Sequence, residues 1–350
     1  MKPEDQERAL QMADMVNRYG DVSQRVGIYS VKKFLKRAQH ESIVDKFAQF
    51  TPIPKNHSQT LKFRRYKSLD RITTPLTEGV NPDGRKLTVE DVTARIDQYG
   101  GVVKLTDQIL DTHEDPVLNE ATSLLGEQAG ESFEAIKIGI LKAATNQFFA
   151  GGTTTATVSK AVSLGLLREV YRSLRRNQAQ KITRIVKAGP NISTEPVGAS
   201  YILMGHCDLE TDFRKIEGFI PVEKYGNSMS AISEYEIGKV ENFRIILTNM
   251  FEPTKATGAE GTTLLSGGVA PSAQAKADIY PLFAVGRDAY AFTPLGGEHS
   301  AHVVVVNPKP CQSDPLGLNG SVGWKGWMGG TILNDLWMSL IWVGCSASYE

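Results

Sequence analysis

The chain has 350 residues, a length that suits about two domains at roughly 100–200 residues each. Its hydrophobic content of 41% and charged content of 22% are those of a folded protein, which excludes disorder of the whole chain. Lys and Arg number 39, as do Asp and Glu, so the net charge gives no overall attraction to nucleic acid or to a membrane surface. The three cysteines form no Cys-x-x-Cys pair and indicate a reducing compartment rather than a disulfide framework: Cys207, Cys311 and Cys345.

The charge is nevertheless unevenly distributed. Residues 1–70 hold 14 Lys and Arg against 8 Asp and Glu, residues 107–134 hold 8 acids and no Lys or Arg, and residues 168–187 hold 7 bases and 1 acid. Blocks of opposite sign can complement each other within a subunit or between subunits. Solvated helix faces would produce the same pattern, so both interpretations stay open.

The first 50 residues are predicted to form an amphipathic basic arm. Apolar residues recur there at loose helical spacing, beside a cluster of bases: Lys32, Lys33, Lys36 and Arg37. No apolar export segment occurs near the start, and the most apolar stretch, residues 331–344, is too short for a membrane span. We therefore expect no signal peptide and no membrane contact. Two prolines in "TPIPKNHSQT" (51–60) end the arm.

Residues 60–105 are predicted to form a long two-stranded projection. "LKFRRYKSLDRI" is a strand candidate, and "LTVEDVTARIDQYGGVVKL" alternates with period two. Between them, "NPDG" (81–84) is a β-turn sequence in which Gly84 would supply a positive φ. An isolated hairpin is marginal in water, so this projection is expected to lie on a neighbouring subunit.

A long helix is predicted after the projection, with Asp115 as its N-cap and Pro116 at its first position. The pattern allows it to run to Phe149, about 34 residues or about 50 Å. Its glycines would serve close backbone contact or a gentle bend: Gly126, Gly130 and Gly139. Four glutamates share the face opposite the apolar positions: Glu120, Glu127, Glu131 and Glu134.

The rest of the chain has a mixed α/β pattern and carries no common catalytic signature. "LGLLREVYRSLRRNQA" predicts a basic helix, followed by strands such as "ASYILMG" and "FRIILTNM". In "GHCDLE", we expect Asp208 to cap a short helix and Cys207 to pack as a small hydrophobe. No phosphate loop, dinucleotide fingerprint, nucleophile elbow or HExxH motif occurs. We predict no catalytic residue, no cofactor and no metal site.

Several segments of the chain follow one another in a characteristic order: "TPLTEG", a strand ending "QYG", the link "TD…DTHEDP", a helix with "LGEQA", "GFIPVEKYG" and the terminal "GWKGWMGGTILNDLWMSLIWV". In this order they resemble the major capsid proteins of the N-four type of tailed bacteriophage and related prophages. The resemblance implies an α+β protein with the Hong Kong 97-type capsid fold. Its four parts would be an N-terminal arm (1–56), an extended E-loop (57–106), a peripheral domain with a long spine helix (107–157 and 286–350) and an axial domain (158–285).

The function implied by this resemblance is that of a major capsid protein. Its subunits would form hexamers and pentamers and close an icosahedral shell around the double-stranded DNA of a tailed phage. Expected partners are further copies of the chain, a portal, scaffolding or decoration proteins, and packaged DNA held by non-specific contact. The expected location is the virion capsid, and the host bacterial cytoplasm during assembly.

Two sets of residues are predicted to make contacts between subunits. The resemblance assigns the first to the E-loop tip: Thr74, Pro75, Leu76, Thr77, Glu78, Asn81, Pro82, Asp83 and Gly84. The second is a hypothesis of charge complementarity, in which the four glutamates of the long helix meet the four bases of the arm.

Two alternatives stay open at this point. One is an encapsulin-like cellular nanocompartment, which would share the fold and enclose protein rather than DNA. The other is a soluble metal-dependent enzyme that uses His299, His302 and a distant acid, since "HSAH" is an HxxH pair. Metal ligation needs further ligands, and no adjacent residue supplies them.

Overall fold

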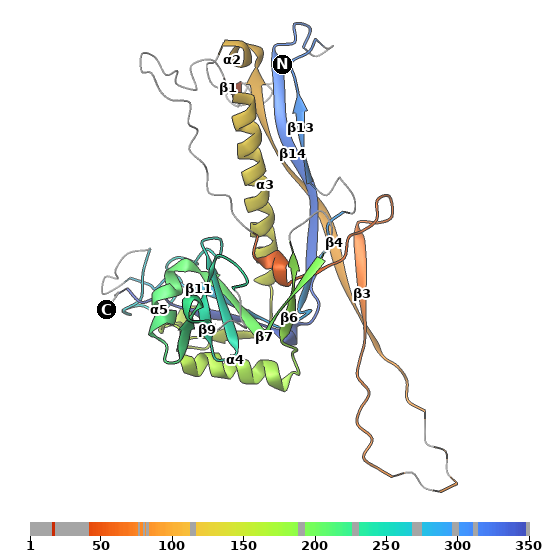
Figure 1. Ribbon diagram of the computed structural model, residues 1–350, viewed down its shortest axis with the longest axis vertical. Coiled ribbons are helices and arrows are strands. Elements are labelled where there is room, and N and C mark those ends of the chain that lie inside the picture. The colour runs from red at the N-terminus through yellow and green to blue at the C-terminus, as the bar shows by residue number, and fades with distance from the viewer. Residues whose placement is uncertain are drawn as a thin grey trace, which may run out of the picture.

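The computed structural model describes residues 16–17, 42–75, 78–79, 81, 84–112, 117–187, 193–225, 231–267, 275–295, 301–310 and 314–347. These residues form two β-sheets and a long helix, α3 (Val117–Leu141), which runs along the first sheet (Figure 1). Helices and mostly antiparallel strands in separate segments confirm the predicted α+β class. Within the described part of the chain, no helix has both the length and the apolar character needed to cross a membrane.

The first sheet is built around β4 (Val89–Thr106) and β14 (Asn319–Ile332). The two strands pair antiparallel, from Ile96 opposite Gly329 to Thr106 opposite Asn319. β4 alternates between exposed and buried side chains over much of its length, as its period-two sequence predicts. The shorter strands of this sheet are β1 (Val16–Asn17), β2 (Gln49–Phe50), β3 (Thr60–Tyr66), β12 (Tyr290–Phe292) and β13 (Ala301–Val306).

α3 packs one side against this sheet. Phe133 meets Trp324 of β14 edge-on, with ring centroids 5.3 Å apart, and a short helix, α2 (Asp107–Thr112), joins β4 to the start of α3. The predicted helix is too long, because α3 ends at Leu141 and residues 147–149 form a strand, β5. Phe148 and Phe149 pack against the core of the second sheet, and this burial overrides the helical pattern. Asp115 and Pro116 lie outside the described residues.

The second sheet has the order β5-β15-β11-β7-β10-β9-β8, with β6 beside β7. β7 and β10 run parallel, and β11 joins β7 to the last strand, β15. The strands are β5 (Gln147–Phe149), β6 (Ile182–Lys187), β7 (Ser193–His206), β8 (Phe219–Pro221), β9 (Glu236–Val240), β10 (Phe243–Thr248), β11 (Tyr280–Val285) and β15 (Met338–Val343). Single turns of 3-10 helix are η1 (Val44–Phe47), η2 (Thr155–Thr157), η3 (Cys207–Leu209), η4 (Val222–Lys224) and η5 (Asp335–Trp337).

Two hydrophobic clusters cover opposite faces of the second sheet. One contains Ile202, Met204 and Leu340 together with the C-terminal end of α3. The other contains alternate residues of the same strands and the apolar sides of α4 (Leu164–Arg176) and α5 (Glu210–Lys215). The end of α3 and helix α4 therefore lie on opposite faces of one sheet. β14 belongs to the first sheet and β15 to the second, so the strands near the C-terminus contribute to both sheets.

Candidate assembly surfaces

A long hairpin leaves the body of the subunit on the side away from α3 (Figure 1). β3 pairs with the first half of β4, from Thr60 opposite Arg95 to Tyr66 opposite Val89. The predicted projection reached residue 105, but the free hairpin ends at Arg95 because β4 pairs with β14 from Ile96 onward. One continuous strand thus belongs to both the hairpin and the first sheet.

Cross-strand ion pairs fix the register of the hairpin. The guanidinium of Arg64 binds the carboxylate of Asp91 at 2.8 Å, and that of Arg65 binds Glu90 at 2.7 Å. These hydrogen bonds lower the pKa values of Asp91 and Glu90. All four side chains are largely exposed, so they orient the two strands without forming a core.

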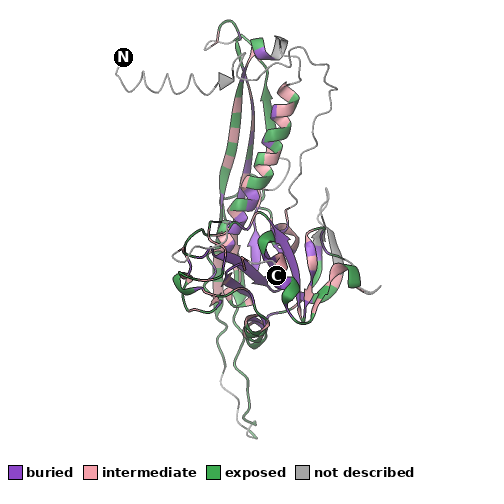
Figure 2. Ribbon diagram, turned by 90° about the vertical axis from the view of Figure 1, so that its left-hand side faces the viewer, coloured by how far each residue is buried: buried purple, intermediate pink, exposed green. Residues whose placement is uncertain are grey.

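Beyond these pairs, the hairpin exposes apolar side chains. Leu69, Ile72 and Leu87 are 54%, 70% and 67% exposed, and Figure 2 shows the extended segment exposed on both legs. Large exposed apolar patches mark contacts with other molecules, and the exposed apolar side chains of the hairpin are candidates for such a contact. This observation supports the predicted role of the projection as a contact surface.

The tip residues are only partly described. Those that the structure describes are all exposed: Thr74, Pro75, Glu78, Asn81 and Gly84. The other four of the predicted set, Leu76, Thr77, Pro82 and Asp83, lie outside the described residues. The positive φ expected at Gly84 occurs instead at Gly79, with φ +79°. Glycine adopts this conformation without strain. The central residues of the predicted "NPDG" turn, Pro82 and Asp83, lie outside the described residues.

Three of the predicted glutamates follow one another along one face of α3, where Glu131 is exposed and Glu120 and Glu127 are half-buried. Glu120, Glu127 and Glu131 are separated by seven and four residues, so they lie on one face of the helix, and Leu124, 40% exposed, lies between them. We call these four residues the acidic stripe.

Glu134 does not belong to the acidic stripe, which corrects the sequence-based prediction. Its side chain is buried, with 1% of its surface exposed. One carboxylate oxygen accepts the backbone N–H groups of Ile43 and Val44, both at 3.2 Å, and the other accepts the hydroxyl of Ser42. A glutamate on an otherwise acidic helix face gives no sequence signal for this role, because its partners lie about 90 residues away.

Two further polar contacts fix the same segment, one to α3 and one to β12. The ammonium of Lys137 binds the carboxylate of Asp45 at 2.6 Å, and the Tyr290 hydroxyl donates to the Val44 carbonyl at 2.7 Å. Burial raises the pKa of Tyr290 well above its ordinary value, so the hydroxyl stays a donor. The last part of the predicted arm, residues 42–50, is thereby attached to the helix of its own subunit. The four arm bases lie outside the described residues: Lys32, Lys33, Lys36 and Arg37.

α4 presents a basic face to solvent, as predicted. Its apolar side, formed by Leu167, Val170 and Leu174, is buried against the second sheet. Ser163 caps its first turn by accepting the N–H of Leu166. The outward side carries four arginines: Arg168, Arg172, Arg175 and Arg176.

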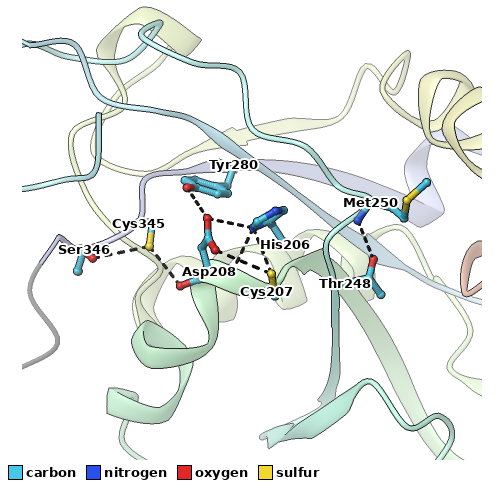
Figure 3. A network of polar contacts seen from close by, with 8 residues as sticks. All are labelled: His206, Cys207, Asp208, Thr248, Met250, Tyr280, Cys345 and Ser346. Atoms are coloured by element: carbon cyan, nitrogen blue, oxygen red, sulfur yellow. Dashed lines mark hydrogen bonds and ion pairs between the residues drawn. The ribbon is translucent and has the colours of Figure 1, made fainter. Parts of the chain in front are cut away.

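A polar network lies where β7 ends (Figure 3). His206 accepts the N–H of Asp208 at 3.2 Å and thereby caps η3, so the expectation that Asp208 caps a helix is wrong. Asp208 instead accepts the Tyr280 hydroxyl at 2.8 Å, and its carbonyl accepts the Cys345 thiol at 3.3 Å. Cys207 is exposed rather than packed in the core, where Cys345 lies.

The electrostatics of this network do not favour a nucleophile. Burial raises the pKa of Cys207, and it raises that of Cys345 to about 12, so both thiols stay protonated near neutral pH. Burial also lowers the pKa of His206, which keeps the imidazole neutral. Among the described residues, one group of three metal-ligand side chains gathers within 4.8 Å, and it is His206, Cys207 and Asp208. The Asp208 carboxylate of this group also binds the Tyr280 hydroxyl of β11, whereas the contacts of the Cys207 thiol and of His206 Nδ1 stay within residues 206–208.

Solved capsid structures share this fold. The chain matches the capsid of cyanophage P-SCSP1u (10% identity, TM-score 0.58, covering 94% of this chain and 97% of that one). It also matches the head of Helicobacter pylori bacteriophage KHP40 (12% identity, TM-score 0.62, covering 96% of this chain and 100% of that one). A third match is the capsid of Ralstonia phage GP4 (11% identity, TM-score 0.61, covering 93% of this chain and 99% of that one). A comparison with curated protein sequences gave no match.

The sequence itself matches a family model described as phage capsid protein over residues 89–342. The match begins at the first residue of β4 and extends almost to the end of β15, so it includes α3 and most of both sheets. The chain therefore belongs to the phage capsid protein family.

Proposed function

We propose that the chain is the major capsid protein of a tailed phage, whose copies assemble as hexamers and pentamers into the icosahedral shell. The observation that carries the proposal is the hairpin, which extends apolar side chains away from the core of its own subunit. Ordering such a segment costs conformational entropy, which contacts with a neighbouring subunit offset. The work of the protein is then assembly rather than chemical turnover.

The tip residues Thr74 to Gly84 would lie across the adjacent subunit, as the resemblance implies. The shell would enclose double-stranded DNA, held by non-specific contact with basic side chains. A portal and scaffolding or decoration proteins would be further partners. Assembly would take place in the cytoplasm of the bacterial host.

Electron microscopy of the purified protein at high concentration, with light scattering for its mass, tests this proposal. Closed shells or rings of five and six subunits are the expected result. A monomer or dimer at every concentration, including in extracts of phage-infected cells, would contradict it.

The second candidate is an encapsulin-like compartment, which the same fold would serve. The contents of shells purified from cells distinguish the two. Nuclease-protected DNA supports the phage capsid, and a stoichiometric protein cargo supports the compartment.

A further inference from the structure

The outward face of α4 is a line of three arginines, and the part of its own subunit that the structure describes supplies a carboxylate partner to the first of them only. Arg168, Arg172 and Arg176 follow one another at intervals of four residues, opposite the buried side of the helix. Arg168 binds Glu241 at 2.6 Å. Among the described residues, no carboxylate forms an ion pair with Arg172 or Arg176.

Repulsion among these arginines destabilises α4 in the isolated subunit. Like charges four residues apart on a helix destabilise it, as opposite charges there stabilise it. Glu169 is the sole acid of α4, and it lies toward the side of this line. A line of unneutralised arginines is stabilised when an anionic surface covers it.

The acidic stripe of α3 has matching dimensions. Glu120 and Glu131 are eleven residues apart, or about 16 Å along the helix, and Arg168 and Arg176 are eight residues apart, or about 12 Å. Among the described residues, no base forms an ion pair with Glu120 or Glu131. The two lines have opposite charge and similar length.

The two lines cannot meet within one subunit. The end of α3 and helix α4 pack on opposite faces of the second sheet. In Figure 1, α4 lies along the edge from which the hairpin also projects, whereas α3 rises on the other side of that sheet. A contact between them joins two copies of the chain.

From these observations we infer that the arginine face of α4 docks on the acidic stripe of α3 of an adjacent copy. This inference rests on the proposed function, and it names one contact by which the subunits are joined. A contact between two different faces is head-to-tail, and such contacts close into rings when the rotation between copies allows it. The hairpin projects from the same edge as α4, so both would reach toward the same neighbour.

The position of α4 favours a protein partner over nucleic acid. Figure 1 is viewed down the shortest axis of the subunit, and α4 lies at its lower edge rather than on the broad side facing the viewer. Figure 2 shows the same helix end-on beneath the sheet, between the two broad sides. Enclosed DNA would lie against one broad side of a flat subunit in a shell, and adjacent copies would meet at its edges.

Charge reversal on each side, and then on both, tests the inference. We compare the wild type with the pair Arg172→Glu and Arg176→Glu, the pair Glu120→Arg and Glu131→Arg, and the four changes combined. Shell yield is measured by electron microscopy and sedimentation, and folding by circular dichroism and thermal unfolding. Each pair alone is expected to lower the yield of shells at least about tenfold, since a tenfold change needs only a few weak pairs lost together. The combination is expected to restore most of it.

The matched control changes two exposed lysines elsewhere around the second sheet, Lys224→Glu and Lys255→Glu, which alters net charge by the same amount. Normal shells are expected. Normal shells from the α4 pair, or a combination no better than its parts, would overturn the inference. So would shells of normal yield that hold less DNA, since α4 would then face the genome. Failure of the wild type to assemble would contradict the proposed function instead.

A last comparison separates α4 from the basic arm. Reversal of Lys32, Lys33, Lys36 and Arg37 is combined with the same change of the acidic stripe. If the reversed stripe restores the reversed arm and not the reversed α4, the arm is the partner of the stripe and the inference fails. Restoration of α4 alone supports it.

Discussion

Glu134 of α3 accepts the backbone N–H of Val44 from a segment 90 residues earlier in the chain. The carboxylate is buried and also accepts the N–H of Ile43, so two donors depend on one side chain. Ile43 and Val44 belong to the last part of the predicted arm. Glu134 therefore fixes this part of the arm to α3.

Glu134→Ala is expected to lower the free energy of unfolding by about 2–4 kcal/mol, because it leaves buried N–H groups without an acceptor. Glu134→Gln keeps an acceptor and is expected to cost less. Glu131→Gln, one turn earlier on the exposed side, serves as the control and should change stability by less than about 0.5 kcal/mol. Denaturant unfolding of the isolated subunit measures all three. Equal effects of Glu134→Ala and Glu131→Gln would contradict the structure.

The second prediction concerns a buried ion pair in the second sheet. Arg244 binds Glu236 through two hydrogen bonds of 2.6 and 2.8 Å, and both side chains are almost fully buried. Glu236 also accepts the Tyr225 hydroxyl and the N–H of Ile232. Arg244→Met leaves a buried carboxylate uncompensated and is expected to cost about 3–5 kcal/mol.

A double-mutant cycle checks this prediction. Adding Glu236→Gln to Arg244→Met removes the uncompensated charge, and it keeps one oxygen to accept the Ile232 N–H while the amide NH2 can donate to the Tyr225 hydroxyl. The double variant is therefore expected to be more stable than Arg244→Met alone. Additive losses would show that the two side chains do not act as a pair.

The third prediction is a pH dependence of stability. Burial lowers the pKa of His206 below its ordinary value of 6.5, against the opposing effect of Asp208. In the pH range between the folded and unfolded pKa values, the unfolded chain binds more protons, so the free energy of unfolding falls as pH decreases below 6.5. His206→Asn retains a side-chain acceptor for the cap and cannot titrate. Unfolding measured from about pH 5 to pH 8 should show a shallower acid slope for the variant, and identical slopes would contradict the prediction.

The fourth prediction separates folding from assembly at the hairpin. Ile72→Asp combined with Leu87→Asp replaces two exposed apolar side chains, so subunit stability should change by less than about 0.5 kcal/mol. The yield of shells is expected to fall sharply. Ser68→Asp with Thr73→Asp adds the same charge beside them and should have the smaller effect. Equal yields from both pairs would show that the apolar side chains make no contact.

The fifth prediction uses the glycines of α3. Apart from the backbone of α3 itself, no atom of the described residues lies within 4 Å of a Cβ added at Gly126 or Gly130. Alanine in a helix is more favourable than glycine by about 1 kcal/mol, so each change to alanine should stabilise the isolated subunit. Thermal unfolding checks this. A stabilised subunit that no longer assembles would place a neighbouring copy against that glycine, and a destabilised subunit would contradict the prediction.

The sequence was informative where local pattern and structure agree. The alternation of β4 and the amphipathic pattern of α4 each persist over many residues, and both elements form as predicted. The end of α3 was not predictable in this way. Residues after Leu141 still suit a helix. They leave it because residues 147–149 pair with β15, which is contributed by residues about 190 positions later, and because the half-buried Phe148 and Phe149 pack against the core of the second sheet.

The residues of the candidate surfaces also differ in how far local sequence pattern predicts their position. Exposed charge can be inferred from helical spacing, which is why Glu120, Glu127 and Glu131 were assigned to one face correctly. Glu134 has the same helical spacing but is buried, because the segment around Val44 covers it. His206 likewise gives no capping signal in "GHCDLE", since the cap depends on the direction in which β7 ends. Which partner meets the charged faces stays a prediction.

The hairpin has no hinge of its own at its base. β4 continues without interruption from the hairpin into the ladder with β14, where eleven of its residues are paired. A displacement of the hairpin is therefore transmitted through the backbone of β4 to the first sheet. The direction in which the hairpin projects is therefore set by the twist of that sheet. Inserting one residue near Arg95 would turn every side chain of the outer half of β4 to the opposite face. It would thereby change which side chains of the hairpin face the neighbouring subunit.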